Sequence, residues 1–209
     1  MPATRTARAN APTSKNLKRN SRRPDACRPK TAIAGRHWDQ SGMYVLKHGI
    51  KRNPQKRWAL PDRIFFGHGA CAILAGTFLR HPPLEGFYGE RIIPDVGFSG
   101  NHIYVTNGLI AFDYHGYCAR ERLLEHHERS WASRNAGWHC TIAKVDFDLL
   151  DKTELNRRKM LGPDQYPHDP IPRARQFLQR RNHAEAAARA LRAATRLAAD
   201  YRPAVSDPT

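Results

Sequence analysis

The segment 101–114, NHIYVTNGLIAFDY, constrains the fold more than any other part of the sequence. Apolar and polar residues alternate on both sides of Asn107-Gly108, a dipeptide typical of type I′ hairpin turns because both residues tolerate positive φ. A two-residue turn there predicts an antiparallel hairpin in which His102 lies directly opposite Asp113. Since side chains alternate between faces along a strand, one face is then apolar and the other carries these two polar residues. The predicted apolar face consists of Ile103, Val105, Ile110 and Phe112.

A second apolar segment predicts a buried helix that begins near Cys71. Its apolar residues recur at helical spacing, and Pro82-Pro83 ends the pattern. The run from Ala70 to Leu79 is much shorter than the roughly 20 residues that a membrane-spanning helix needs. This excludes an integral membrane protein, and we expect no membrane partner. The predicted apolar face of the helix consists of Cys71, Leu74, Ala75, Phe78 and Leu79.

Together these patterns predict an α+β fold, in which an antiparallel sheet packs against the Cys-bearing helix and a further helix follows at the C-terminus. Residues 1–36 contain too few large aliphatic side chains to offset the entropy lost on ordering. The predicted organisation is a disordered basic tail over 1–36, a catalytic α+β domain over 37–160, a Pro-rich linker over 161–172 and an amphipathic basic helix over 173–202.

Positive charge is concentrated towards the two ends of the chain. The protein has 35 Lys and Arg against 19 Asp and Glu, a net charge of +16. Residues 1–60 hold 15 basic and 2 acidic residues, whereas residues 61–150 hold 8 and 10. Because basic tails neutralise phosphates without reading bases, we predict weak, non-specific nucleic-acid binding through residues 1–36. The first residues lack the apolar stretch of a secretory signal, which favours a cytoplasmic location.

The hairpin and the helix carry the residue types of a thiol-dependent active site. Cysteine attacks as its thiolate, which is favoured at a helix N-terminus and beside an imidazolium. The imidazole needs a partner that fixes its tautomer and orientation. Cys71, His102 and Asp113 supply these three groups. If the Cys71 helix packs on the Tyr104 side of the hairpin, Cys71 lies near His102. We expect His68 and Tyr104 to be substrate-binding residues beside the site.

A cysteine at a helix start, followed by His and Asp on consecutive strands, resembles the papain-like superfamily in its transglutaminase-like and NlpC/P60-like branches. The resemblance covers residues 67–117 and includes HIYVTNGLIAFD. It implies that Cys71 attacks an amide or thioester carbonyl, that His102 is the general base and that Asp113 orients it. It further implies a cysteine-dependent amide hydrolase or acyl transferase, with a peptide or amide substrate and no cofactor. Ala70-Cys71-Ala72 matches neither the Cys-Trp nor the Asp-Cys-Ser pattern usual in the two branches.

Two alternatives compete with this hypothesis. The segments 68–71 and 115–118 both read His-Gly-x-Cys, and two such pairs would supply a tetrahedral zinc site with two nitrogen and two sulfur ligands. The ligands of that small zinc-binding domain would be His68, Cys71, His115 and Cys118. The other alternative is a non-catalytic basic protein that associates with nucleic acid through its flanks. The enzyme hypothesis predicts a Cys71 thiol that reacts at mildly acidic pH, which neither alternative predicts.

Overall fold

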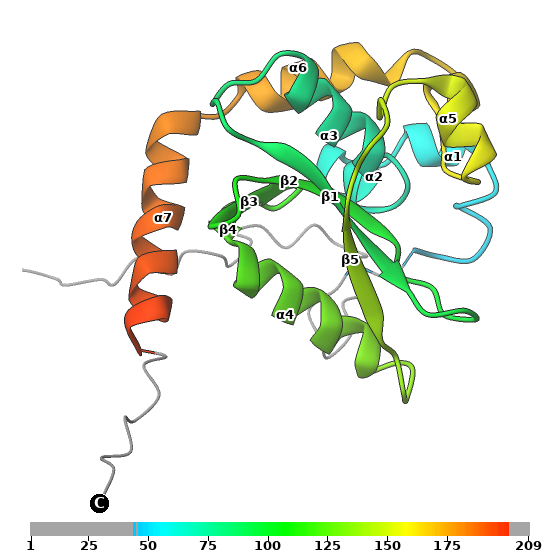
Figure 1. The fold of residues 1–209 in the computed structure, drawn as a ribbon. Coiled ribbons are helices and arrows are strands. Elements are labelled where there is room, and N and C mark those ends of the chain that lie inside the picture. The colour runs from blue at the N-terminus through cyan, green and yellow to red at the C-terminus, as the bar shows by residue number, and fades with distance from the viewer. Residues whose placement is uncertain (1–43, 45, 201–209) are drawn as a thin grey trace, which may run out of the picture. The chain divides into compact units, whose positions relative to one another are not determined.

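The structure, a computed structural model, describes Tyr44 and residues 46–200 (Figure 1). The tail predicted over 1–36 lies outside the described residues. The strands are β1 Tyr88–Pro94, β2 His102–Thr106, β3 Ile110–Asp113, β4 Gly116–Ala119 and β5 Cys140–Lys144. The helices are α1 Pro54–Trp58, α2 Asp62–Gly67, α3 Cys71–Arg80, α4 Arg120–Ala132, α5 Lys152–Arg157, α6 Pro170–Gln179 and α7 His183–Asp200, and η1 Pro163–Gln165 is a 3-10 turn. Over the part of the chain described, no helix is both long and apolar enough to cross a bilayer.

The five strands form one antiparallel sheet in the order β4-β3-β2-β1-β5, so the predicted α+β class is confirmed. The helix that begins at Cys71 is confirmed as α3, which packs against β2 and α6 (Figure 1). The main apolar core lies between α3, α6 and the face of the sheet that they cover. The largest fully buried residues of this main core include Phe66, Phe78, Val105 and Phe112. A smaller cluster lies under α4 on the other face of the sheet.

The hairpin forms, but its register differs by two residues from the prediction. Val105 pairs with Phe112 and Thr106 with Ala111, so His102 is not directly opposite Asp113. Both residues nevertheless lie on one face, because a shift of two residues preserves the alternation of side chains. The predicted apolar face is therefore correct, although the predicted pairs are wrong.

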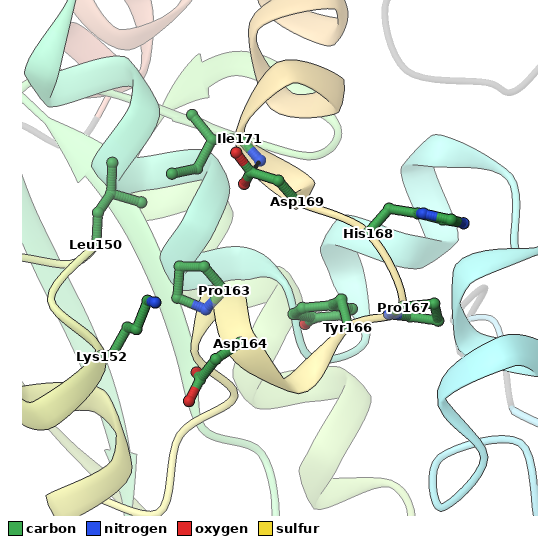
Figure 2. Close-up of a pocket in the computed structure, with 9 residues that line it drawn as sticks. All are labelled: Leu150, Lys152, Pro163, Asp164, Tyr166, Pro167, His168, Asp169 and Ile171. Carbon is green, nitrogen blue, oxygen red and sulfur yellow. Dashed lines mark hydrogen bonds between the residues drawn. The ribbon is translucent and has the colours of Figure 1, made fainter.

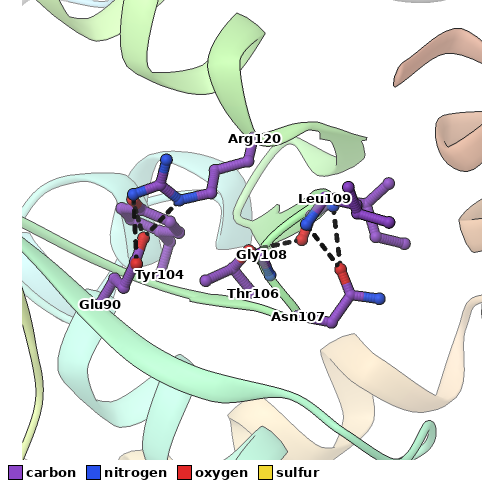
Figure 3. A network of polar contacts seen from close by, with 8 residues as sticks. Glu90, Tyr104, Thr106, Asn107, Gly108, Leu109 and Arg120 are labelled. Carbon is purple, nitrogen blue, oxygen red and sulfur yellow. Dashed lines mark hydrogen bonds and ion pairs between the residues drawn. The ribbon is translucent and has the colours of Figure 1, made fainter. Parts of the chain in front are cut away.

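The cause of the shift is the way in which side chains close the turn (Figure 3). Only Gly108 has positive φ (92°) in the turn, whereas a type I′ turn needs it at two positions. The Asn107 Oδ1 accepts hydrogen bonds from the amides of Leu109 and Ile110, at 3.1 and 3.0 Å. Thr106 Oγ1 accepts from the Gly108 amide at 3.0 Å. These bonds centre the turn on Gly108 and Leu109, one residue later than predicted.

The segment predicted as a linker over 161–172 is part of the packed domain. Tyr166 is buried in the main core, between η1 and α6. Its ring lies against Phe65, with the ring centroids 5.2 Å apart. Proline is used here to start a helix rather than to separate domains, since α6 begins at Pro170, and a proline is tolerated in the first helical turn.

The single helix predicted over 173–202 is wrong, because two helices, α6 and α7, occupy this region. The chain leaves the helix at 180–182 and restarts where the Asn182 side chain accepts from the Glu185 amide. This is the bond of an N-cap, which sequence periodicity does not reveal. Phe177 of α6 is buried in the main core, whereas α7 packs its alanines against β4.

Candidate active site

His102 and Asp113 meet at one end of the central strands. His102 begins β2 and Asp113 ends β3, and the His102 Nε2 lies 3.1 Å from the Asp113 Oδ2. Both side chains are buried, with 6% and 3% of their surfaces exposed. The observed register makes them diagonal neighbours on one face, which remains within reach of long side chains. The predicted contact between His102 and Asp113 therefore exists, although the two residues are not directly paired across the strands as predicted.

Cys71 reaches His102 from the other side of the sheet. The core that surrounds α3 contains Ile103, Val105 and Phe112, so α3 packs on the face opposite Tyr104 and not on the Tyr104 side. The thiol nevertheless lies close enough to the His102 ring and the Ile103 backbone for both to lower its pKa. The geometry works because Cys71 and His102 are each the first residue of their element, so they meet at the sheet's end. Cys71 remains partly exposed.

The three groups stabilise one another's charged forms. Burial alone would raise the pKa of Cys71, but the hydrogen bond and charge of His102 outweigh it and lower that pKa. Burial would lower the pKa of His102, but Asp113 and Cys71 raise it to about 10. Burial opposes the ionisation of Asp113 as well, and the two neighbouring histidines, His115 and His102, hold its pKa below the ordinary value. The arrangement favours a thiolate–imidazolium pair at neutral pH.

Further histidines surround the triad, and sequence reasoning did not assign them to it. The backbone amide of His115 donates to Asp113 Oδ1 at 2.7 Å, and its ring lies 3.4 Å from Oδ2. The His127 ring stacks on His102 with centroids 5.6 Å apart and an interplanar angle of 15°. Burial and the charge of His102 lower the pKa of His127 to about 3, so it packs there as a neutral ring. The helical segment that carries His127 gives no sequence signal of this contact.

His68 lies near the site as expected. It ends α2 just before α3, and its ring meets the edge of Tyr44 with centroids 5.8 Å apart. Burial, with help from nearby charges that include His102, lowers the pKa of His68 to about 4. His68 is thus a neutral, partly exposed side chain beside the triad, and a substrate-binding role remains a proposal.

Tyr104 is placed differently from the expectation for a substrate-binding residue. It is fully buried, and its hydroxyl donates to Glu90 Oε2 at 2.5 Å. Arg120 pairs with the same carboxylate, its Nε lying 2.8 Å from Oε2 (Figure 3). The ring of Tyr104 stacks near His102, at 6.3 Å between centroids. Tyr104 therefore supports the strand that carries His102 and has no surface to offer a substrate.

The zinc alternative is not supported. Among residues 44 and 46–200, no group of three or more His, Cys, Asp or Glu side chains is arranged to hold a metal ion. Cys118 belongs to the cluster on the α4 face, with Tyr104 and Ala111, whereas Cys71 begins α3 on the opposite face. The repeated His-Gly-x-Cys pattern thus does not bring its two cysteines together.

Two tyrosines complete the surroundings of Cys71. Burial raises the pKa values of Tyr114 and Tyr166, and the charge of Cys71 contributes to both shifts. Tyr114 also meets the edge of the His102 ring, with centroids 5.5 Å apart. Tyr166 borders a hollow of about 400 Å³ between η1 and the start of α6 (Figure 2). Both hydroxyls remain protonated donors at neutral pH.

Comparisons of the chain with protein-family models, with curated proteins and with solved structures found no match.

Proposed function

We propose that the protein is a cysteine-dependent amide hydrolase or acyl transferase of papain-like, transglutaminase-like type, with Cys71, His102 and Asp113 as its triad. The observation that carries the proposal is the buried His102–Asp113 pair, 3.1 Å apart, with Cys71 near enough that His102 lowers its pKa and is itself shifted upward by Cys71. A buried carboxylate, a buried imidazole and a cysteine at a helix N-terminus rarely serve a purely structural purpose together, since perturbed pKa values gather at functional sites.

The proposed reaction begins with attack by the Cys71 sulfur on a substrate carbonyl carbon. The S–C bond forms, and the C=O π electrons move to oxygen, which becomes an oxyanion. When the C=O bond re-forms, the C–N or C–S bond of the substrate breaks, and the His102 imidazolium gives its proton to the leaving atom. The acyl group is now a thioester on Cys71. Water, or an acceptor amine in the case of transfer, loses a proton to His102 as it attacks and releases the acyl group.

Asp113 positions His102 rather than touching the substrate. Because Nε2 is bound to Asp113, Nδ1 is the ring nitrogen left to face the thiol. The Asp113 carboxylate also stabilises the imidazolium, which must persist until the leaving group departs. Its second oxygen is held by the His115 amide, so the carboxylate cannot rotate freely away from His102.

The test is acylation of the full chain by p-nitrophenyl acetate, with the modified residue identified by peptide mass spectrometry. We expect release of p-nitrophenolate and acetylation of Cys71 in preference to Cys118 and Cys140. Cys71→Ala should abolish this reaction, and His102→Ala should slow it by about 100-fold or more. Acetylation spread evenly over the four cysteines, Cys27 included, or none at Cys71, would overturn the proposal. Addition of methylamine distinguishes the two outcomes of the second step, since a transferase forms the amide and a hydrolase forms acetate.

A further inference from the structure

The proposed attack creates an oxyanion that needs hydrogen-bond donors close to Cys71. Such donors are effective when they are preorganised around the position where the charge develops. The α3 helix has ten residues and begins at Cys71, so the Cys71 amide is among those without an acceptor inside the helix. One backbone donor is thus in place, and a second donor would have to come from the surroundings of Cys71.

Tyr166 is the one described tyrosine whose hydroxyl is buried and has no hydrogen-bond partner among the described residues. The residue is only 9% exposed. Its hydroxyl lies 3.9 Å from the position that a Cβ on Gly69 would occupy, two residues before Cys71. Buried polar atoms are nearly always satisfied, and an exception indicates a missing partner. This hydroxyl therefore lies beside the residues that lead into α3, and a group bound at the start of that helix would supply its acceptor.

The Tyr166 ring is held firmly. The Arg57 guanidinium lies over it, 5.2 Å from the ring centroid, and Phe65 packs against it at the same centroid distance. Arg57 Nη2 also donates to the carbonyl of Gln165 at 2.7 Å, which fixes the backbone next to the tyrosine. Burial and the Cys71 charge keep the hydroxyl protonated. A rigid, protonated donor is what stabilisation of a developing negative charge requires.

We propose that the Tyr166 hydroxyl, together with the Cys71 backbone amide, donates a hydrogen bond to the oxyanion that forms when the Cys71 sulfur adds to a substrate carbonyl. This inference rests on the proposed function. Tyr166 donates a hydrogen bond without transferring its proton, and the oxyanion collapses to a carbonyl when the leaving group departs. The acceptor is the carbonyl oxygen of an ester, thioester or amide.

The test compares two reactions of the same thiol in full-length Tyr166→Phe. Alkylation by iodoacetamide forms an S–CH₂ bond without an oxyanion, whereas acetylation by p-nitrophenyl acetate passes through one. We expect Tyr166→Phe to leave the alkylation rate of Cys71 unchanged and to reduce its acetylation rate tenfold or more, since a lost oxyanion donor costs about 10²–10³ in related chemistry. Tyr117→Phe is the control, because the Tyr117 hydroxyl already has a partner, His183 Nδ1 at 2.8 Å.

Thermal unfolding shows whether the variant keeps its fold. Removal of an unpartnered buried hydroxyl should not lower the Tm, whereas a hydroxyl with a structural bond should lower it when removed. If the parent acetylates Cys71 and Tyr166→Phe does so at the same rate, the role of Tyr166 is overturned and the proposed function stands. An equal loss of alkylation and acetylation, or a lowered Tm, assigns Tyr166 to structure instead. If the parent fails to acetylate Cys71, both proposals fall.

Discussion

At the residue scale, the ionisation of Cys71 and His102 determines the chemistry. The pKa of the thiol is lowered and that of the imidazole is raised to about 10, so each charged form depends on the other. For His102, a folded pKa above the ordinary 6.5 contributes stability that is present below pH 6.5 and lost as the pH rises through 10. For Cys71, the lowered pKa contributes stability above its ordinary value of 9, which is lost as the pH falls through the folded value.

The first prediction is that Cys71 reacts with iodoacetamide at mildly acidic pH. Its labelling rate should reach half of its maximum below the ordinary thiol pKa, because the rate follows the thiolate fraction. In His102→Ala, burial remains and the imidazolium is lost, so the midpoint should move above the ordinary value. The measurement is the labelling rate of each cysteine against pH, followed by mass spectrometry.

Cys140 is the internal control for this measurement. Burial, with nearby acidic residues, raises its pKa, so it should label only in alkaline solution. If Cys71 and Cys140 label with the same pH midpoint in the parent protein, the thiolate–imidazolium pair does not exist and Cys71 is an ordinary core cysteine.

The second prediction concerns Asp113. Asp113→Asn removes the negative charge while keeping the shape, so the pKa of His102 should fall and Cys71 labelling at pH 6 should slow. Loss of this buried, charged hydrogen-bond acceptor should lower the free energy of unfolding by about 2–3 kcal/mol at pH 7. The difference from the parent should shrink as the pH falls below about 4, because the lowered pKa of Asp113 contributes stability only above its unfolded value.

Urea unfolding at several pH values measures this effect, with Asp148→Asn as the matched control. Asp148 pairs with Arg80 at 2.7 Å, but about half of each side chain is exposed, so its loss should cost less than about 1 kcal/mol. Equal effects of the two substitutions would show that Asp113 is not coupled to a buried charge.

At the element scale, the connection between α2 and α3 positions Cys71. Gly69 has φ 127°, a region that other residues rarely adopt, and a Cβ there would lie 2.8 Å from the Leu161 Cδ1. The backbone therefore favours glycine at this point, and a Cβ would also force the Leu161 side chain to shift. The start of α3, and with it Cys71, is oriented by this residue.

The third prediction is that Gly69→Ala lowers the free energy of unfolding by about 2–3 kcal/mol and slows Cys71 labelling at pH 6. Gly86→Ala is the control, since Gly86 has φ 80° but nothing within 4 Å of a Cβ, and its substitution should cost only about 1 kcal/mol. Urea unfolding and labelling rates are measured on both variants. A Gly69→Ala protein that labels at the parental rate would show that the turn does not control the thiol.

The hairpin and the candidate site show which features could be predicted from the sequence. The alternation of apolar residues predicted the two faces of the hairpin, because alternation survives a register shift of two residues. The register of β2 against β3 could not be predicted, because hydrogen bonds of the Asn107 side chain, rather than the backbone preference of Asn-Gly, determine the position of the turn. Cys71, His102 and Asp113 were found from their types and order. His127 and Tyr166 were not, because their contacts depend on packing between elements distant in sequence.

At the scale of the whole molecule, the C-terminal helices belong to the domain rather than to an appendage. Arg173 of α6 donates to Asp62 at 2.8 Å and to the carbonyl of Trp58 at 2.6 Å, and its guanidinium lies over the ring of Phe65. The region from 163 to 200 therefore completes the core and supplies Tyr166. Local periodicity could not show this, because these contacts join residues more than a hundred positions apart.

The fourth prediction concerns the charged tail. Residues 1–36 carry ten Lys and Arg and one Asp. Deleting them should remove most binding to duplex DNA and leave Cys71 labelling unchanged, because phosphate contacts would lie in the tail. Binding of the full chain should weaken with salt at a log–log slope of about −0.9 per neutralised phosphate. Fluorescence anisotropy over a salt series measures both effects. Sequence-selective binding by residues 37–209 at about 150 mM salt would favour the non-catalytic nucleic-acid alternative.

The meeting of Cys71 and His102 at the ends of two separate elements has a consequence for biosynthesis. The helix and the strand come together only once the sheet has paired and the core has closed over α3. Until then the thiol lacks its imidazolium and has the reactivity of any free cysteine. If the thiolate–imidazolium pair forms as proposed, labelling of Cys71 at pH 6 therefore follows folding, because only native molecules label rapidly at this residue.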